Sequence, residues 1–126
     1  MSSWQSGEIQ ANGIRLHYTR TGGGKTPFVL VHGVMDDGLC WAPVAQVLAP
    51  DYDVIMVDAR GHGRSSKPKG GYDPLTQAYD LFGVIQALEL KRPVLLGHSM
   101  GAITVLVLAG LHPEIPRVAL LEDPPH

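Results

Sequence analysis

The sequence predicts an α/β fold in which a mostly parallel sheet carries helices on both faces. Three observations predict it: short apolar runs alternate with helical segments, an Asn-Gly turn lies near the start, and glycine-containing loops follow the apolar runs. Continuous apolar strands are typical of parallel sheets, which are buried on both faces. With 126 residues, 44% of them hydrophobic and 17% charged, we expect one globular domain over residues 1–126 with a modest core.

The expected elements follow in order along the chain. The segment from Glu8 to Tyr18 alternates around Asn12-Gly13, which indicates a β-hairpin. Four apolar strands are expected after it, at 28–31, 54–57, 93–96 and 118–121. Helices are expected between them, at 41–48, 74–88 and 100–111. The pair Asp73-Pro74 supplies an N-cap and a first-turn proline for the second helix.

Right-handed crossovers would bring the carboxyl ends of these four strands to one rim of the sheet, where ligands of such folds bind. Four segments follow the strands and should share that rim: His32-Gly33, Asp58 onward, Gly97 to Gly101, and Glu122-Asp123. We expect Asp58 and Arg60 to tie down their own loop.

The stretch Gly97-x-Ser99-x-Gly101 lies where a strand gives way to a helix. A sharp turn there strains the serine backbone and lifts the hydroxyl out of the sheet edge. The flanking glycines avoid collisions with the neighbouring strand and helix. The helix N-terminus favours developing negative charge, so the Met100 amide would face an oxyanion, and the Val34 amide, after Gly33, would supply a second hydrogen bond.

The sequence resembles the α/β-hydrolases, in the branch of esterases and cofactor-free haloperoxidase-like serine hydrolases. The matching pieces are Val31 to Gly33, Asp58 to Ser65, Leu96 to Gly101, and Leu121 to Pro125. The resemblance implies an incomplete three-layer α/β-hydrolase fold with strands 1–6 of the N-terminal part, without the lid and the C-terminal strands. It also implies that Ser99 is the nucleophile and that the Val34 and Met100 amides form the oxyanion hole. Serine at this position, rather than aspartate, argues against the epoxide hydrolase and haloalkane dehalogenase branches.

The triad of the family runs serine, acid, histidine along the chain. The resemblance places its histidine after the last strand of the complete fold, so the catalytic histidine is not identified here. Glu122 and Asp123 end the last expected strand, where some family members keep their acid, although a loop-capping carboxylate pair is the simpler interpretation. A serine without its base keeps its proton. We therefore expect weak activity or none from the 126 residues alone.

The last strand, Val118 to Leu121, is apolar on both faces but would form an open edge. We therefore expect a homo-oligomer or a complementing C-terminal half, together with a small-molecule acyl substrate. The net charge of −2, without a basic cluster, argues against nucleic acid and membrane surfaces as partners. A single cysteine, Cys40, and no evident signal peptide favour a reducing, cytoplasmic compartment. We expect Cys40 to be a small apolar filler.

Two alternative functions belong to other classes. One is a non-catalytic remnant of a hydrolase that self-associates or binds a small ligand at the rim. The other is nucleotide binding through Thr21 to Thr26, but a P-loop needs glycine where Thr19 stands and a helix after the Lys-Thr pair. The histidines and acids show no metal-ligand spacing, so no cofactor and no metal are expected.

Overall fold

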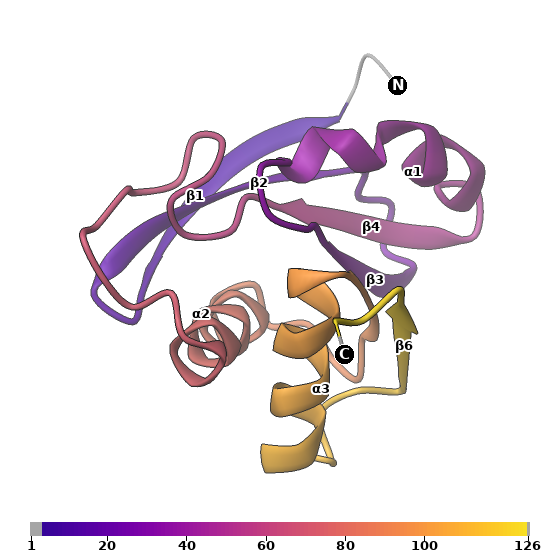
Figure 1. Cartoon of the computed structure of the whole chain (residues 1–126). Helices are drawn as coiled ribbons and strands as arrows, with labels where there is room; N and C mark the ends of the chain where they lie inside the picture. Colours follow the sequence, from indigo (N-terminus) through magenta and orange to yellow (C-terminus); the bar gives the residue numbers. More distant parts are fainter. Residues whose placement is uncertain (1–3, 126) are drawn as a thin grey trace.

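The computed structural model describes residues 4–125 as a twisted sheet with helices packed against both faces (Figure 1). The strands are β1 (Gln5–Ala11), β2 (Ile14–Arg20), β3 (Thr26–Val31), β4 (Tyr52–Val57), β5 (Val94–His98) and β6 (Val118–Glu122). The helices are the 3-10 turn η1 (Gly38–Trp41), α1 (Ala42–Leu48), α2 (Pro74–Ala87) and α3 (Met100–Leu111).

The sheet has the strand order β1-β2-β4-β3-β5-β6. The pairs β1–β2 and β2–β4 are antiparallel, whereas β4–β3, β3–β5 and β5–β6 are parallel. The expected mostly parallel sheet with helices on both faces is therefore confirmed. The parallel part places the carboxyl ends of β3, β4, β5 and β6 on one rim, as the sequence predicts.

The hairpin between β1 and β2 turns at Asn12 and Gly13, whose φ angles are 53° and 81°. Two positive φ angles define the type I′ turn, whose twist matches that of the flanking strands. The turn sets the register in which Ala11 lies opposite Ile14. The expectation from the Asn-Gly pair is thus confirmed.

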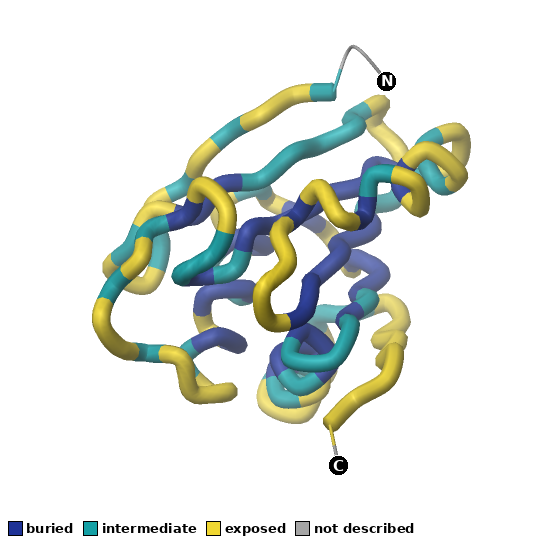
Figure 2. The backbone as a smooth tube through the Cα atoms, turned by 45° about the horizontal axis from the view of Figure 1, so that its top comes forward, coloured by how far each residue is buried: buried dark blue, intermediate teal, exposed yellow. Residues whose placement is uncertain are grey.

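Two apolar layers sandwich the sheet. One face packs against α2 and α3 through a cluster that includes Val29, Ile55, Val84 and Val105. The other face packs against η1 and α1 through Leu30, Met56, Trp41 and Ala45. Figure 2 shows the buried residues gathered in the interior of the molecule and the exposed residues along its outer loops and its C-terminal segment. The continuous apolar runs are therefore strands covered on both sides.

The helices differ slightly from their expected bounds. Helix α2 starts as predicted: Asp73 accepts a hydrogen bond from the Thr76 N–H at 3.0 Å, and Pro74 occupies the first turn. The helix expected from Trp41 is instead preceded by the 3-10 turn η1, so that Trp41 ends one element and caps the next. No helix among residues 4–125 is both long enough and apolar enough to cross a lipid bilayer.

Strand β6 is an edge of the sheet within the described residues, and every residue along it is exposed. Val118 and Leu120 retain 46% and 42% of their accessible surface. They lie opposite Val94 and Leu96 of β5, which belong to the apolar layer on the α1 side. The open apolar edge expected for this strand is therefore present.

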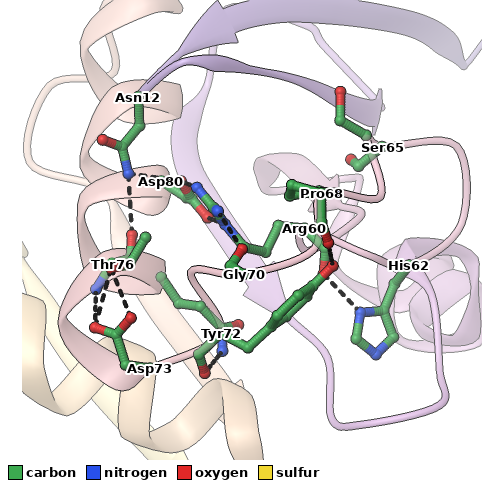
Figure 3. A network of polar contacts seen from close by, with 12 residues as sticks. Asn12, Arg60, His62, Ser65, Pro68, Gly70, Tyr72, Asp73, Thr76 and Asp80 are labelled. Carbon is green, nitrogen blue, oxygen red and sulfur yellow. Dashed lines mark hydrogen bonds and ion pairs between the residues drawn. The ribbon is translucent and has the colours of Figure 1, made fainter.

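The long loop after β4 and the hairpin are both anchored to α2 (Figure 3). Arg60 donates hydrogen bonds to both carboxylate oxygens of Asp80, at 2.7 and 2.9 Å, and to the Gly70 carbonyl at 3.0 Å. Asn12 at the hairpin turn donates to the same Asp80 at 2.9 Å. Arg60 thus stabilises its own loop, as expected, and also ties that loop to a helix.

Candidate active site

Ser99 lies at the sharp turn between β5 and α3, with φ 53° and ψ −113°. A positive φ is uncommon for a residue other than glycine, and such strain costs about 1–3 kcal/mol. The surrounding hydrogen bonds hold the turn in place. The Ser99 N–H donates to the Glu122 carbonyl at 2.9 Å, and the Ser99 carbonyl accepts the Ala102 N–H at 2.9 Å. The strained serine expected from the sequence is therefore present.

The two glycines of the turn are required by packing. A Cβ atom on Gly97 would overlap the carbonyl of Gly101, and a Cβ atom on Gly101 would overlap the carbonyl of Val31. Helix α3 therefore approaches β3 and β5 more closely than any side chain at these positions allows. This close approach brings the first turn of α3 to the rim beside Ser99.

The loop after β3 lies next to the same turn. A Cβ atom on Gly33 would be 3.3 Å from the Cβ of Ser99. Val34 follows it with a side chain that is 60% exposed. Met100 occupies the first position of α3, where backbone N–H groups have no partner within the helix. Val34 and Met100 therefore lie on chain segments that flank Ser99.

Two histidines of the rim are engaged with backbone atoms. His32 is completely buried, its Nδ1 lies 2.7 Å from the Gly33 carbonyl, and its Nε2 accepts the Ala59 N–H at 3.0 Å. Burial lowers the pKa of His32 below its ordinary value, and the neighbouring His62 acts in the same direction. Nδ1 of His62 lies 2.9 Å from the Arg60 carbonyl. Both imidazole rings therefore hold the backbone of the loops after β3 and β4 in place.

The other described histidines also have partners away from the Ser99 hydroxyl. Nδ1 of His98 lies 3.4 Å from the Glu122 carboxylate, His112 stacks on Phe82, and His17 contacts Asp58. Within residues 4–125, no histidine forms a hydrogen bond with Ser99 Oγ. His126 falls outside the described residues.

The two candidate acids lie at the end of β6. Glu122 is the last residue of the strand, with a side chain that is 60% exposed and directed at His98. Asp123 follows with a φ of 50° and is also exposed. Glu122 contacts Ser99 through its backbone carbonyl. The described residues contain no group of three or more histidine, cysteine, aspartate or glutamate side chains placed to hold a metal ion.

The expectation for Cys40 is wrong, because its side chain is exposed in the turn η1 and does not fill the core. Partial desolvation raises the pKa of its thiol to about 11, and the nearby Asp36 and Asp37 carboxylates add to the rise. The sequence does not indicate that Cys40 is exposed, because its apolar neighbours Leu39 and Trp41 suggest a buried segment. The 3-10 turn directs only Trp41 of these three residues inward.

Comparison with known proteins identifies the class. The family model described as alpha/beta hydrolase fold matches residues 26–126, so the chain belongs to the α/β-hydrolase family. It is 39% identical over 120 residues to N-formylmaleamate deformylase of Pseudomonas putida, covering 94% of this chain and 45% of that protein. It is 39% identical over 111 residues to an epoxide hydrolase of Caballeronia sordidicola, covering 85% of this chain and 33% of that protein.

Solved structures agree with this assignment. A bacterial membrane phospholipase A matches with a TM-score of 0.93 and 29% identity, over 98% of this chain and 41% of that one. N-formylmaleamic acid deformylase of Pseudomonas putida S16, in a serine-to-alanine variant, matches with a TM-score of 0.89 and 33% identity, over 96% of this chain and 47% of that one. The chain therefore spans less than half the length of these relatives.

Proposed function

We propose that the chain forms the nucleophile-bearing part of a serine hydrolase that acts on carboxylic esters or similar acyl substrates. Ser99 attacks the carbonyl carbon, and the amides of Val34 and Met100 donate hydrogen bonds to the resulting oxyanion. The observation that carries the proposal is the strained backbone of Ser99 between two glycines whose packing tolerates no side chain. One such amide donor contributes on the order of 3–4 kcal/mol to stabilising the transition state.

The acyl substrate class includes N-acyl compounds as well as esters. Two curated relatives at 39% and 32% identity are named N-formylmaleamate deformylase and 2-(acetamidomethylene)succinate hydrolase. The first name describes removal of a formyl group, and the second describes hydrolysis of a compound that carries an acetamido group. A serine elbow attacks either kind of carbonyl, because the same tetrahedral intermediate forms. The epoxide hydrolases among the relatives support membership of the α/β-hydrolase family. The serine at position 99, where that branch has an aspartate, supports a reaction with acyl substrates instead of epoxides.

The general base for Ser99 comes from protein outside residues 4–125. Four histidines of the described part form hydrogen bonds with other groups, and the fifth, His98, has its Nδ1 buried near the Glu122 carboxylate. The exposed strand β6 offers an edge for further strands. The occupant that fits this edge is a complementing C-terminal half, because the relatives are more than twice as long as this chain. Glu122 or Asp123 at the end of β6 would then face the base. A non-catalytic remnant that associates through β6 as a homo-oligomer is the competing function.

A chimera tests the proposal. The chain is fused to the part of the Pseudomonas putida deformylase that lies beyond the matched region, and hydrolysis of p-nitrophenyl acetate is measured. We expect turnover in the chimera, a loss of at least 10³-fold in Ser99→Ala, and little turnover in the chain alone. A folded chimera whose turnover is unchanged by Ser99→Ala contradicts the proposal. Sedimentation of the unfused chain as an oligomer that Leu120→Glu dissociates would favour the competing function.

A further inference from the structure

Ser6, His17 and Asp58 form a hydrogen-bonded series away from Ser99. Ser6 Oγ lies 2.5 Å from Nε2 of His17, and Nδ1 of the same ring lies 2.8 Å from Oδ2 of Asp58. The three residues come from β1, β2 and the loop after β4, which the antiparallel pairs β1–β2 and β2–β4 bring together. A histidine between a serine hydroxyl and a buried carboxylate is the arrangement that activates serine as a nucleophile.

The partners of Asp58 determine which ring nitrogen of His17 carries the proton. Asp58 accepts the backbone N–H groups of Gly38 at 2.7 Å and Arg64 at 3.0 Å, in addition to His17 Nδ1. When Asp58 is ionised and His17 is neutral, the carboxylate only accepts hydrogen bonds, which places the proton of the imidazole on Nδ1. Nε2 is then an acceptor, and the Ser6 hydroxyl donates to it. The proton of Ser6 is therefore directed at a base.

The base is buried while the serine is exposed. His17 and Asp58 keep 6% and 5% of their accessible surface, whereas Ser6 lies on the outside of β1. The backbone of His17 is fixed because its N–H donates to Ser65 Oγ at 2.9 Å, and Ser65 Oγ donates to the Asp58 carbonyl at 2.6 Å. A Cβ atom on Gly63 would meet the Asp58 carboxyl group, so glycine permits this close packing.

Ser6 opens onto a cavity of about 190 Å³, whose walls also include Thr19, Leu39 and Arg64. This volume accommodates a small acyl group. Two strands, β4 and β3, lie between β2 and β5. At a strand spacing of about 4.8 Å, His17 is roughly 14 Å across the sheet from the Ser99 turn. The cavity is therefore separate from the site at Ser99.

We propose that Ser6 is a second nucleophilic serine, which small activated esters acylate in this cavity. Oγ of Ser6 forms a bond to the carbonyl carbon while its proton moves to Nε2 of His17. The bond between the carbonyl carbon and the leaving oxygen then breaks, and that oxygen takes the proton from His17. The products are an ester on Ser6 and a free alcohol, so atoms and charges balance without a further reactant.

Acetylation of the Ser99→Ala chain by p-nitrophenyl acetate tests this proposal independently of the Ser99 site. Mass spectrometry of the tryptic fragment 1–15, with fragmentation to place the acetyl group, reports on Ser6. We expect acetyl-Ser6 in the folded chain and a rate at least about 100-fold lower in His17→Gln, because a positioned general base contributes 10²–10⁴-fold. Ser66→Ala is the matched control and keeps the full rate, since Ser66 Oγ accepts the Arg15 N–H and is not a member of the series of Ser6, His17 and Asp58.

Two results overturn the proposal. One is the absence of acetyl-Ser6 in a folded Ser99→Ala chain. The other is an equal rate in His17→Gln that retains the native circular dichroism spectrum. If His17→Gln does not fold, the comparison is made between the folded and the urea-unfolded Ser99→Ala chain. The proposal requires Ser6 to react at least tenfold faster when folded, and equal rates refute it.

Discussion

Gly101, in the first turn of α3, packs directly against the backbone carbonyl of Val31 at the end of β3. This contact sets the distance between the helix that follows Ser99 and the strand that leads to Val34. The two segments that flank the serine are therefore positioned by backbone contacts. This positioning requires glycine at position 101, because a side chain there would overlap the Val31 carbonyl.

Gly101→Ala is expected to lower the free energy of unfolding by about 1–3 kcal/mol, because the new methyl group overlaps a backbone atom that cannot rotate away. Urea denaturation measures the change. Gly110→Ala, on the same helix with open space around it, is the matched control and should stabilise the chain by about 0.5–1 kcal/mol. Equal effects of the two substitutions would contradict the close packing of Gly101 against Val31.

Removing one partner of the ion pair between Arg60 and Asp80 should cause a large loss in the free energy of unfolding. Both side chains are at least nine-tenths buried, so Arg60→Met leaves the Asp80 carboxylate without its main partner. We expect a loss of about 3–5 kcal/mol in the free energy of unfolding. The exposed pair of Arg15 and Glu8 is the control, and Glu8→Gln should change stability by less than about 1 kcal/mol. A small loss in Arg60→Met would show that the loop after β4 is held by other contacts.

The stability of the folded chain is expected to depend on pH because of the buried His32. Burial lowers the pKa of His32 in the folded chain below its ordinary value of 6.5. Protonation therefore favours the unfolded chain, and the contribution of this residue is complete above about pH 6.5 and is lost as the pH falls below it. Denaturation between pH 5 and 7.5 should show stability falling toward acid, with a smaller slope in His32→Gln. An identical slope in the two proteins would exclude His32 as the source.

Cys40 should react slowly although it is exposed. With its pKa raised to about 11, the thiolate is scarce at pH 7.5, and the greater nucleophilicity of a basic thiolate offsets only part of this. We expect reaction with Ellman's reagent to be about tenfold slower in the folded chain than in urea. A folded chain that reacts as fast as the unfolded one would mean that desolvation does not govern this thiol.

Local patterns predicted the elements well, because their causes are local. Asn12-Gly13 supplies both positive φ angles of a hairpin turn, and Asp73-Pro74 supplies the cap and first turn of α2. The turn at Ser99 was also predictable, since a strand, two glycines and a helix are adjacent along the chain.

Contacts between distant segments were not predictable from one sequence. The hydrogen bonds from Asn12 to Asp80 and from His17 to Asp58 join residues 68 and 41 positions apart. Neither pair carries a spacing that distinguishes it from other polar residues. The packing of α2 against the hairpin brings Asn12 to Asp80, and the pairing of β2 with β4 brings His17 to Asp58. The exposure of Cys40 was missed for a different reason: Cys40 lies in a 3-10 turn just before the helix expected from Trp41, and its apolar neighbours do not indicate which way that turn directs its side chain.

The most direct test of the central claim is a crystal structure of the chimera with the deformylase C-terminal part after reaction with a fluorophosphonate. We expect a phosphonyl group on Ser99 Oγ whose oxygen lies about 2.7–3.1 Å from the amide nitrogens of Val34 and Met100. A phosphonyl oxygen directed away from both amides, or a folded chimera in which Ser99 remains unmodified, would contradict the proposed role of Ser99.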